Sequence, residues 1–228
     1  HTKIKNKNKF ILRRSDAYIG VLIDDLINKG TDEPYRMFTS RAEHRILLRQ
    51  DNADIRLTET GYNLGLASKV RLRNLEKKKE NIDEIRKYAT KTKLSPKQVN
   101  KSLSKLKSAP IKEKRSLEEL IRRPNVYFNS IKDKSVVNVF KTKKKVEIEQ
   151  VEIDIKYESY IKKEIDTVNK MKRLEGSKIP KMFDYNKIKS LSAEGKEKLK
   201  KIKPKSIGQA SRISGVSPSD VSILMVYM

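Results

Sequence analysis

Apolar residues at helical spacing run through most of this chain and limit what it can fold into. One face of a long helix is marked by Leu72, Leu75, Ile82, Ile85 and Tyr88. Ser95-Pro96 begins another helix, which carries an apolar stripe of Val99, Leu103 and Leu106. Ser116 with Glu119 resembles a capping box, and that helix ends before Pro124. The spacing predicts a mainly α fold.

The segment from Val146 to Leu174 fits two patterns. Val151, Ile153 and Ile155 alternate with polar residues as a strand would. Helical spacing is kept instead by Ile148, Val151, Ile155, Ile161, Ile165, Val168 and Met171. The pattern lasts roughly seven turns, which favours one long helix closed by Gly176 and Pro180. Three shorter helices are expected at 193–202, 206–213 and 217–228.

The first 57 residues follow a different pattern. Ser15 fits an N-cap, and the spacing predicts a helix over Ser15–Asn28 that Gly30 ends. From Thr31 to Leu57, Pro34 and many arginines argue against a central strand. We therefore expect an irregular segment with room for short strands, then a multi-helix C-terminal domain ending in a small helical tip. The expected segments are 1–60, 61–145 and 146–228.

The charge of the chain points to a polyanionic partner. Lys and Arg number 54 against 29 Asp and Glu, which gives a net charge of +25. Lysine outnumbers arginine by 39 to 15, so an AT-rich genome that loads solvated surfaces with lysine is the alternative explanation. The uneven distribution favours nucleic-acid contact, because residues 96–145 carry 15 basic and 4 acidic side chains.

Missing residue types exclude several functions. The chain has no cysteine, and hence no disulfide framework, thiolate nucleophile or Cys-ligated metal. Its only histidines are His1 and His44, and its glycines form no phosphate-binding loop. No apolar run approaches the roughly 18–20 residues that span a bilayer. We expect no catalytic, cofactor-binding or metal-ligating residue, and a soluble cytoplasmic protein.

Four arginines stand close together in a chain that otherwise uses lysine: Arg36, Arg41, Arg45 and Arg49. Arginine is preferred where a planar group must bind phosphate through two hydrogen bonds. The alternative is an ion-pair scaffold with nearby carboxylates, namely Asp24, Asp25, Asp32, Glu33, Glu43, Asp51 and Asp54. Both interpretations stay open, since clustered charges serve either purpose.

Residues 206–221 resemble a helix-turn-helix, with Gly215 at the turn and Ser217-Pro218 beginning the second helix. That second helix is too apolar to read a major groove. We expect this tip to dock a partner protein, with DNA binding as the alternative. The candidate docking residues are Arg212, Ile213, Val216, Val221, Leu224 and Met225.

Five blocks of the sequence resemble one known family, MnmG/GidA. They are SDAYIGVLIDDL at 15–26, GTDEPYRMFTSRAE at 30–43, DNADIRLT at 51–58, KYESYI at 156–161 and GQASRISGV at 208–216. The resemblance covers nearly the whole chain and is weak only between about Ala89 and Val146. The chain looks like a C-terminal portion, because the glycine-rich fingerprint and cysteines of the family's FAD domain have no counterpart.

The resemblance implies an FAD-dependent enzyme that works with the GTPase MnmE. Together they add a carboxymethylaminomethyl group to the wobble uridine of certain tRNAs, with methylenetetrahydrofolate as carbon donor and NADH as reductant. It implies a homodimer for the full-length enzyme and an inactive fragment, whose residues 1–60 are the edge of the missing FAD domain. Within the arginine cluster it makes Arg36 and Arg45 the strongest candidates for tRNA contact. A DNA-binding helical module remains the alternative function.

Overall fold

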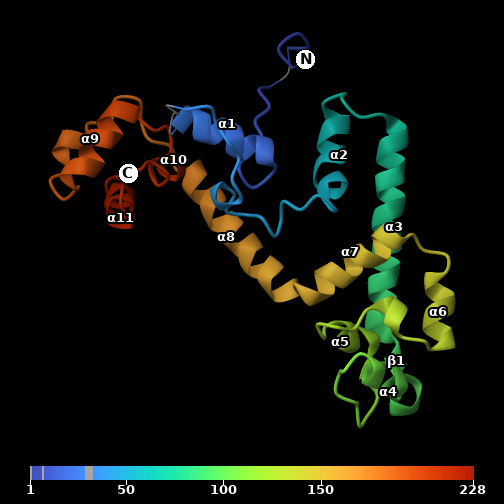
Figure 1. Cartoon of the computed structure of the whole chain (residues 1–228). Helices are drawn as coiled ribbons and strands as arrows, with labels where there is room; N and C mark the ends of the chain where they lie inside the picture. Colours follow the sequence, from blue (N-terminus) through green and yellow to red (C-terminus); the bar gives the residue numbers. More distant parts are fainter. Residues whose placement is uncertain (1, 7, 29–32) are drawn as a thin grey trace. The chain divides into compact units, whose positions relative to one another are not determined.

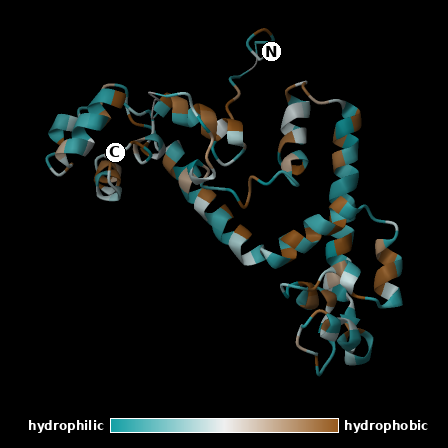
Figure 2. Cartoon of the chain, in the orientation of Figure 1, coloured by the Kyte–Doolittle hydropathy of each residue, from teal (hydrophilic) through white to brown (hydrophobic). Residues whose placement is uncertain are grey.

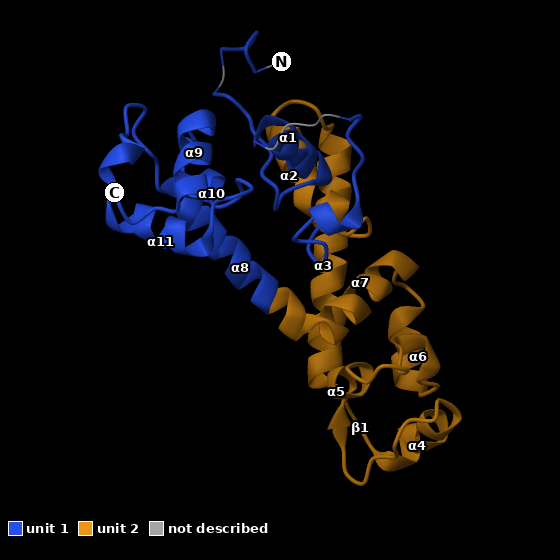
Figure 3. Ribbon diagram, turned by 60° about the vertical axis from the view of Figure 1, so that its left-hand side comes forward, with its two compact units in different colours: residues 1–48, 163–228 blue, residues 49–162 orange. Residues whose placement is uncertain are grey.

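The computed structural model describes residues 2–6, 8–28 and 33–228. It forms two compact units, of which unit 1 contains residues 1–48 and 163–228 and unit 2 contains residues 49–162 (Figure 3). Eleven α-helices and one two-stranded sheet occur among the described residues (Figure 1). The expected mainly α fold is confirmed. No helix in these described ranges is long and apolar enough to cross a membrane.

Unit 2 is organised around α3 (Lys69–Lys91), which packs against α2, α5 and α7. Hydrophobic residues recur at intervals along the mostly hydrophilic α3 (Figure 2), and the buried Leu75 and Ile85 belong to the apolar face that the sequence predicted. Its buried Ile85 and Ala89 join the hydrophobic core of the unit. The other elements are α2 (Ala53–Asn63), β1 (Lys93–Leu94), α4 (Pro96–Lys105), β2 (Arg115–Ser116), α5 (Leu117–Ile121), the 3-10 helix η2 (Phe128–Ser130), α6 (Lys134–Phe140), α7 (Lys145–Lys156) and the start of α8 (Glu158–Gly176).

Two helices of unit 2 begin at the caps that the sequence indicated. Ser95 precedes α4, and its backbone N–H donates to Oε1 of Gln98 at 2.9 Å. Oγ of Ser116 accepts from the backbone N–H of Glu119 at 3.2 Å at the start of α5. These bonds satisfy backbone donors that have no partner within the first turn of a helix.

The sheet lies elsewhere than expected. The sequence predicted an irregular segment with possible short strands over residues 31–57, but its described part, residues 33–57, contains no strand: it has η1 (Thr39–Arg41), turns and the start of α2 at Ala53. Its hydrogen bonds between backbone groups are local, as where the carbonyl of His44 accepts from the backbone N–H groups of Leu47 and Leu48, both at 3.0 Å. The antiparallel pair is β1–β2, in which Lys93 lies opposite Ser116.

The long helix expected over 146–174 is interrupted. The strand alternative is wrong, and the segment forms α7 and α8, separated at Tyr157 with φ −104° and ψ 11°. Hydrogen bonding continues across the break, because the backbone N–H of Tyr157 donates to Ile153 and its carbonyl accepts from Ile161. The apolar spacing is therefore preserved on both sides, and the sequence pattern alone does not reveal the bend.

Unit 1 is built from both ends of the chain. Its helices are α1 (Tyr18–Asn28), η1, the remainder of α8, η3 (Tyr185–Lys187), α9 (Ala193–Ile202), α10 (Ile207–Ala210) and α11 (Pro218–Val226). α1 begins at Tyr18 rather than Ser15, and α10 ends before the expected Ile213. The stop expected at Gly30 lies outside the described residues. The three segments expected from sequence stay a prediction, and the compact units divide the chain at other positions.

One carboxylate joins two helix starts in unit 1. Oδ1 of Asp220 accepts from the backbone N–H of Ser192 at 2.8 Å, and Oδ2 accepts from the Ser192 hydroxyl at 2.9 Å. Oδ2 also accepts from the backbone N–H and the hydroxyl of Ser217, at 3.0 and 2.7 Å. Ser192 caps α9 and Ser217 caps α11, so the buried Asp220 fixes both N-termini.

Candidate nucleic-acid interface

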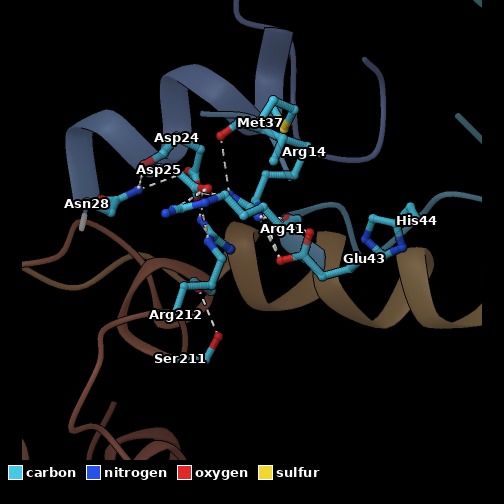
Figure 4. A network of polar contacts seen from close by, with 12 residues as sticks. Arg14, Asp24, Asp25, Asn28, Met37, Arg41, Glu43, His44, Ser211 and Arg212 are labelled. Atoms are coloured by element: carbon cyan, nitrogen blue, oxygen red, sulfur yellow. Dashed lines mark hydrogen bonds and ion pairs between the residues drawn. The ribbon is translucent and has the colours of Figure 1, made fainter. Parts of the chain in front are cut away.

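Arg14 is the centre of a buried cluster of ion pairs in unit 1 (Figure 4). Its Nη1 donates to Oδ1 of Asp25 at 2.6 Å and to Oδ2 of Asp24 at 3.1 Å. Its Nη2 donates to Oε1 of Glu43 at 2.8 Å and to the carbonyl of Arg41 at 2.9 Å. The side chain is 6% exposed. Its donors are used within the protein, so Arg14 holds the fold together rather than meeting a phosphate.

The charge of Arg14 is secured by its partners. Burial by itself would lower the pKa of Arg14, but hydrogen bonds and charge from Glu43 and Asp25 outweigh it, and the pKa is raised above the ordinary arginine value. A buried carboxylate such as Asp25 needs a permanent counter-charge of this kind.

A glycine allows the cluster to form. A Cβ atom at Gly20 would lie 2.2 Å from the carbonyl oxygen of Arg13 and 2.9 Å from that of Leu12. Only glycine permits the backbone before α1 to pass so close to the helix. Arg14 follows directly in this backbone, which brings its side chain to the carboxylates of α1.

Asp25 has two further partners. The hydroxyl of Tyr35 donates to Oδ2 of Asp25 at 2.8 Å, and Nη1 of Arg41 lies 3.6 Å from the same oxygen. The guanidinium carbon of Arg41 lies 4.8 Å from the centroid of the Tyr35 ring, in cation–π contact. Burial, together with the hydrogen bond and charge of Asp25, raises the pKa of Tyr35 and keeps its hydroxyl a donor.

Arg212 connects the C-terminal helices to α1 within unit 1. Its Nε and Nη2 donate to the two carboxylate oxygens of Asp24 at 3.0 and 3.2 Å. Its Nη1 lies 2.5 Å from Oε1 of Glu175, whose other oxygen accepts from the Ser206 hydroxyl at 2.9 Å. The side chain of Arg212 is 10% exposed. Sequence reasoning assigned Arg212 to partner docking, but its guanidinium is occupied inside the unit.

The four clustered arginines fall into two groups. Arg41 is bound to Asp25 as described, and Arg49, in unit 2, lies 3.1 Å from Asp51 and 3.5 Å from Asp154. Arg36 and Arg45 are exposed residues of unit 1. The guanidinium of Arg36 lies over the Phe38 ring at 5.2 Å, and the Arg45 side chain has no ion pair with any described residue. The ion-pair interpretation therefore applies to Arg41 and Arg49, while polyanion binding by Arg36 and Arg45 stays a prediction.

Two residues that organise this region were not singled out by sequence reasoning for that role. Arg14 was overlooked, although it is an arginine in a lysine-rich chain. His44 is 3% exposed, and its Nδ1 lies 2.5 Å from Oε1 of Glu164 in α8. Its partner is 120 residues away in sequence, so no local pattern could have paired them.

The six proposed docking residues also differ in exposure. Ile213 and Leu224 lie in the core of unit 1, and Val216 and Val221 pack against that core. Met225 is 53% exposed, and its neighbours Val226 and Tyr227 are 83% and 54% exposed. The free apolar surface of the tip is thus the end of α11.

Among the described residues, no three His, Cys, Asp or Glu side chains are placed to hold a metal ion.

Comparisons with known proteins agree on one class, the helical C-terminal region of a tRNA-modifying enzyme. Residues 69–165 match the family described as "tRNA modifying enzyme MnmG/GidA C-terminal helical domain". Residues 167–228 match "tRNA modifying enzyme MnmG/GidA C-terminal helical bundle". The chain belongs to the MnmG/GidA family.

Individual relatives agree with this assignment. The chain is 52% identical to the tRNA uridine 5-carboxymethylaminomethyl modification enzyme MnmG of Christiangramia forsetii, with 99% of this chain and 37% of the relative covered. It is 51% identical to the enzyme of the same name from Cytophaga hutchinsonii, where 100% and 37% are covered. Aquifex aeolicus GidA in its form II crystal matches with a TM-score of 0.76 and 37% identity, over 99% of this chain and 35% of that one. The chain thus spans little more than a third of each relative.

Proposed function

We propose that this chain is the tRNA-binding and partner-binding region of an FAD-dependent enzyme that acts with the GTPase MnmE. The pair adds a carboxymethylaminomethyl group to the wobble uridine of certain tRNAs, with NADH as reductant, in the cytoplasm. The full-length enzyme is a homodimer. Support comes from the family assignment and from the names of the relatives, which specify this modification of tRNA uridine.

The observation that supports tRNA binding is that Arg36 and Arg45 are exposed and form no ion pair with a described carboxylate. Both are exposed, while Arg41 and Arg49 are held by carboxylates. An exposed guanidinium can bind two oxygens of a phosphate in a bidentate manner, through two parallel hydrogen bonds. Arg36 and Arg45 therefore contact tRNA in this proposal, and Arg41, bound to Asp25, supports the part of unit 1 that carries them.

The test compares exposed with paired arginines in the full chain. Arg36→Ala and Arg45→Ala should each weaken tRNA binding several-fold, leave the melting temperature unchanged, and reduce the salt dependence by roughly one counterion. Arg41→Ala is the matched control and should lower the melting temperature instead. Equal loss of stability and affinity in Arg36→Ala and Arg45→Ala would favour the ion-pair scaffold.

A competition experiment separates this proposal from DNA binding. At fixed salt, unlabelled tRNA should displace labelled tRNA from the chain at lower concentration than duplex DNA of the same number of phosphates. Preferential displacement by the DNA would instead favour the DNA-binding module.

The FAD site of the proposed enzyme lies outside these 228 residues, because the chain has no glycine-rich loop for a pyrophosphate. Purified chain mixed with FAD and passed through a desalting column should carry no stoichiometric flavin absorbance. A yellow, flavin-bound chain would contradict this placement of the cofactor.

A further inference from the structure

A second positively charged surface lies in unit 2, on the tip formed by residues 93–114. α4 and β1 belong to this tip and lie at the end of unit 2 away from α2 (Figures 1 and 3). Its exposed lysines are Lys93, Lys97, Lys101, Lys105, Lys107, Lys112 and Lys114. The one carboxylate of the tip, Glu113, is bound to Arg115. None of the seven lysines has a salt bridge to a carboxylate in the described parts of the chain.

Three of these lysines form a row along α4. Lys97, Lys101 and Lys105 are four residues apart, so they share one face and follow each other at about 6 Å along the helix axis. The opposite face is fixed, because Val99 and Leu103 are fully buried. Like charges at this spacing repel, and a bound polyanion removes that repulsion.

The loop after α4 is held in place by hydrogen bonds. The Asn100 side chain donates to the carbonyl of Ile111 at 3.0 Å and accepts from its backbone N–H at 2.9 Å. Nη1 of Arg123 donates to the Ser108 hydroxyl at 3.1 Å and to the carbonyl of Ala109. Lys107 and Lys112 therefore stand on an ordered backbone, which lowers the entropic cost of binding.

We propose that the lysine row of α4 is a contact for the phosphate backbone of tRNA that does not read sequence, an inference that rests on the proposed function. Lysine supplies a point charge to phosphate and suits contacts that position an RNA rather than specify its bases. An anionic membrane fits less well, because the tip exposes no large apolar side chain for insertion.

The test removes the row and counts the counterions released on binding. The variant Lys97→Gln/Lys101→Gln/Lys105→Gln is compared with the full chain over a series of salt concentrations. Each lost phosphate contact lowers the slope of log affinity against log salt by about 0.7–0.9, so we expect a decrease of about two and at least roughly tenfold weaker binding at low salt. Unchanged melting temperatures verify the fold.

A matched control carries the same loss of charge elsewhere. Lys163→Gln/Lys170→Gln/Lys172→Gln removes three exposed lysines of α8, which stand among acids such as Asp166. This control should leave the slope nearly unchanged. Equal slopes in wild type and the α4 variant, or equal effects of both variants, would overturn the inference.

Two further outcomes separate the inference from the proposed function. If the wild-type chain binds no tRNA at any salt concentration, the proposed function fails and the inference falls with it. If the α4 variant keeps its tRNA affinity but loses binding to duplex DNA, the row serves DNA and only the inference fails.

Discussion

Nη1 of Arg14 lies 2.6 Å from Oδ1 of Asp25, and the two side chains are 6% and 1% exposed. Removing one member leaves the other charge buried without compensation, at a cost of about 3–5 kcal/mol. We expect Arg14→Met and Asp25→Asn each to lower the free energy of unfolding by about this amount, measured by urea denaturation. In a double-mutant cycle the losses should be clearly non-additive. Additive losses would show that the two side chains act independently.

Gly20 should not tolerate a methyl group. The Cβ atom of Gly20→Ala would lie 2.2 Å from the carbonyl oxygen of Arg13, so the backbone must shift, at a cost of about 1–3 kcal/mol. Gly176→Ala is the control, because nothing lies within 4 Å of a Cβ atom there. Thermal unfolding should show a lower melting temperature for Gly20→Ala alone. An unchanged melting temperature in Gly20→Ala would contradict the close approach of the Arg13 carbonyl to α1.

Lys156 should be important for the stability of unit 2. Its Nζ lies 2.8 Å from the carbonyl oxygens of Ile121 and Val126, and the carbonyls of Arg123 and Pro124 share the three N–H donors of the same ammonium group. Lys156→Met leaves these carbonyls without their donor and should lower the free energy of unfolding by about 1–3 kcal/mol. The exposed Lys162→Met is the control, and hydrogen exchange at residues 121–126 should rise only in Lys156→Met.

The pKa of Asp220 predicts how the free energy of unfolding changes with pH. Burial would raise the pKa of Asp220, but hydrogen bonds from Ser192 and Ser217 outweigh it and lower the pKa from 3.8 to about 2. A carboxylate whose pKa falls on folding stabilises the protein above its unfolded pKa, and this contribution is lost as the pH falls. We expect a loss of about 2 kcal/mol between pH 5 and pH 2.

Asp220→Asn separates this carboxylate from other acids. At pH 7 the variant should already be less stable, and its further loss in acid should be smaller than that of the wild type by the same amount. Urea denaturation at several pH values measures both. Parallel pH profiles for variant and wild type would rule out Asp220 as the source.

Docking of the GTPase is better tested by substitution than by deletion. Removing residues 206–228 would also remove Ile213 and Leu224 from the core and Arg212 from its ion pairs. Met225→Asp should abolish co-purification with MnmE without lowering the melting temperature, because Met225 is 53% exposed. Ser222→Asp, at an exposed position of the same helix, is the control. Retained MnmE capture by Met225→Asp would contradict docking at the end of α11.

Local signals made most helices predictable. The caps at Ser95 and Ser116 and the apolar stripe of α3 act over a few residues, so the sequence displays them directly. The break at Tyr157 was hidden because hydrogen bonding and apolar spacing continue through it. The candidate site was only partly predictable. Arg36 and Arg41 look alike in sequence, and what distinguishes them is a carboxylate brought near Arg41 by folding.

The bond between Arg212 and Asp24 joins residues 188 positions apart, which has a consequence for synthesis on the ribosome. Unit 2 is one continuous stretch and can fold once residue 162 has emerged. Unit 1 is completed later, because Arg212, which binds Asp24, and Glu164, which binds His44, both follow residue 162. During that interval Asp24 has Arg14 but not Arg212 as its counter-charge, so the ion-pair cluster at α1 is completed only after unit 2 has been synthesised.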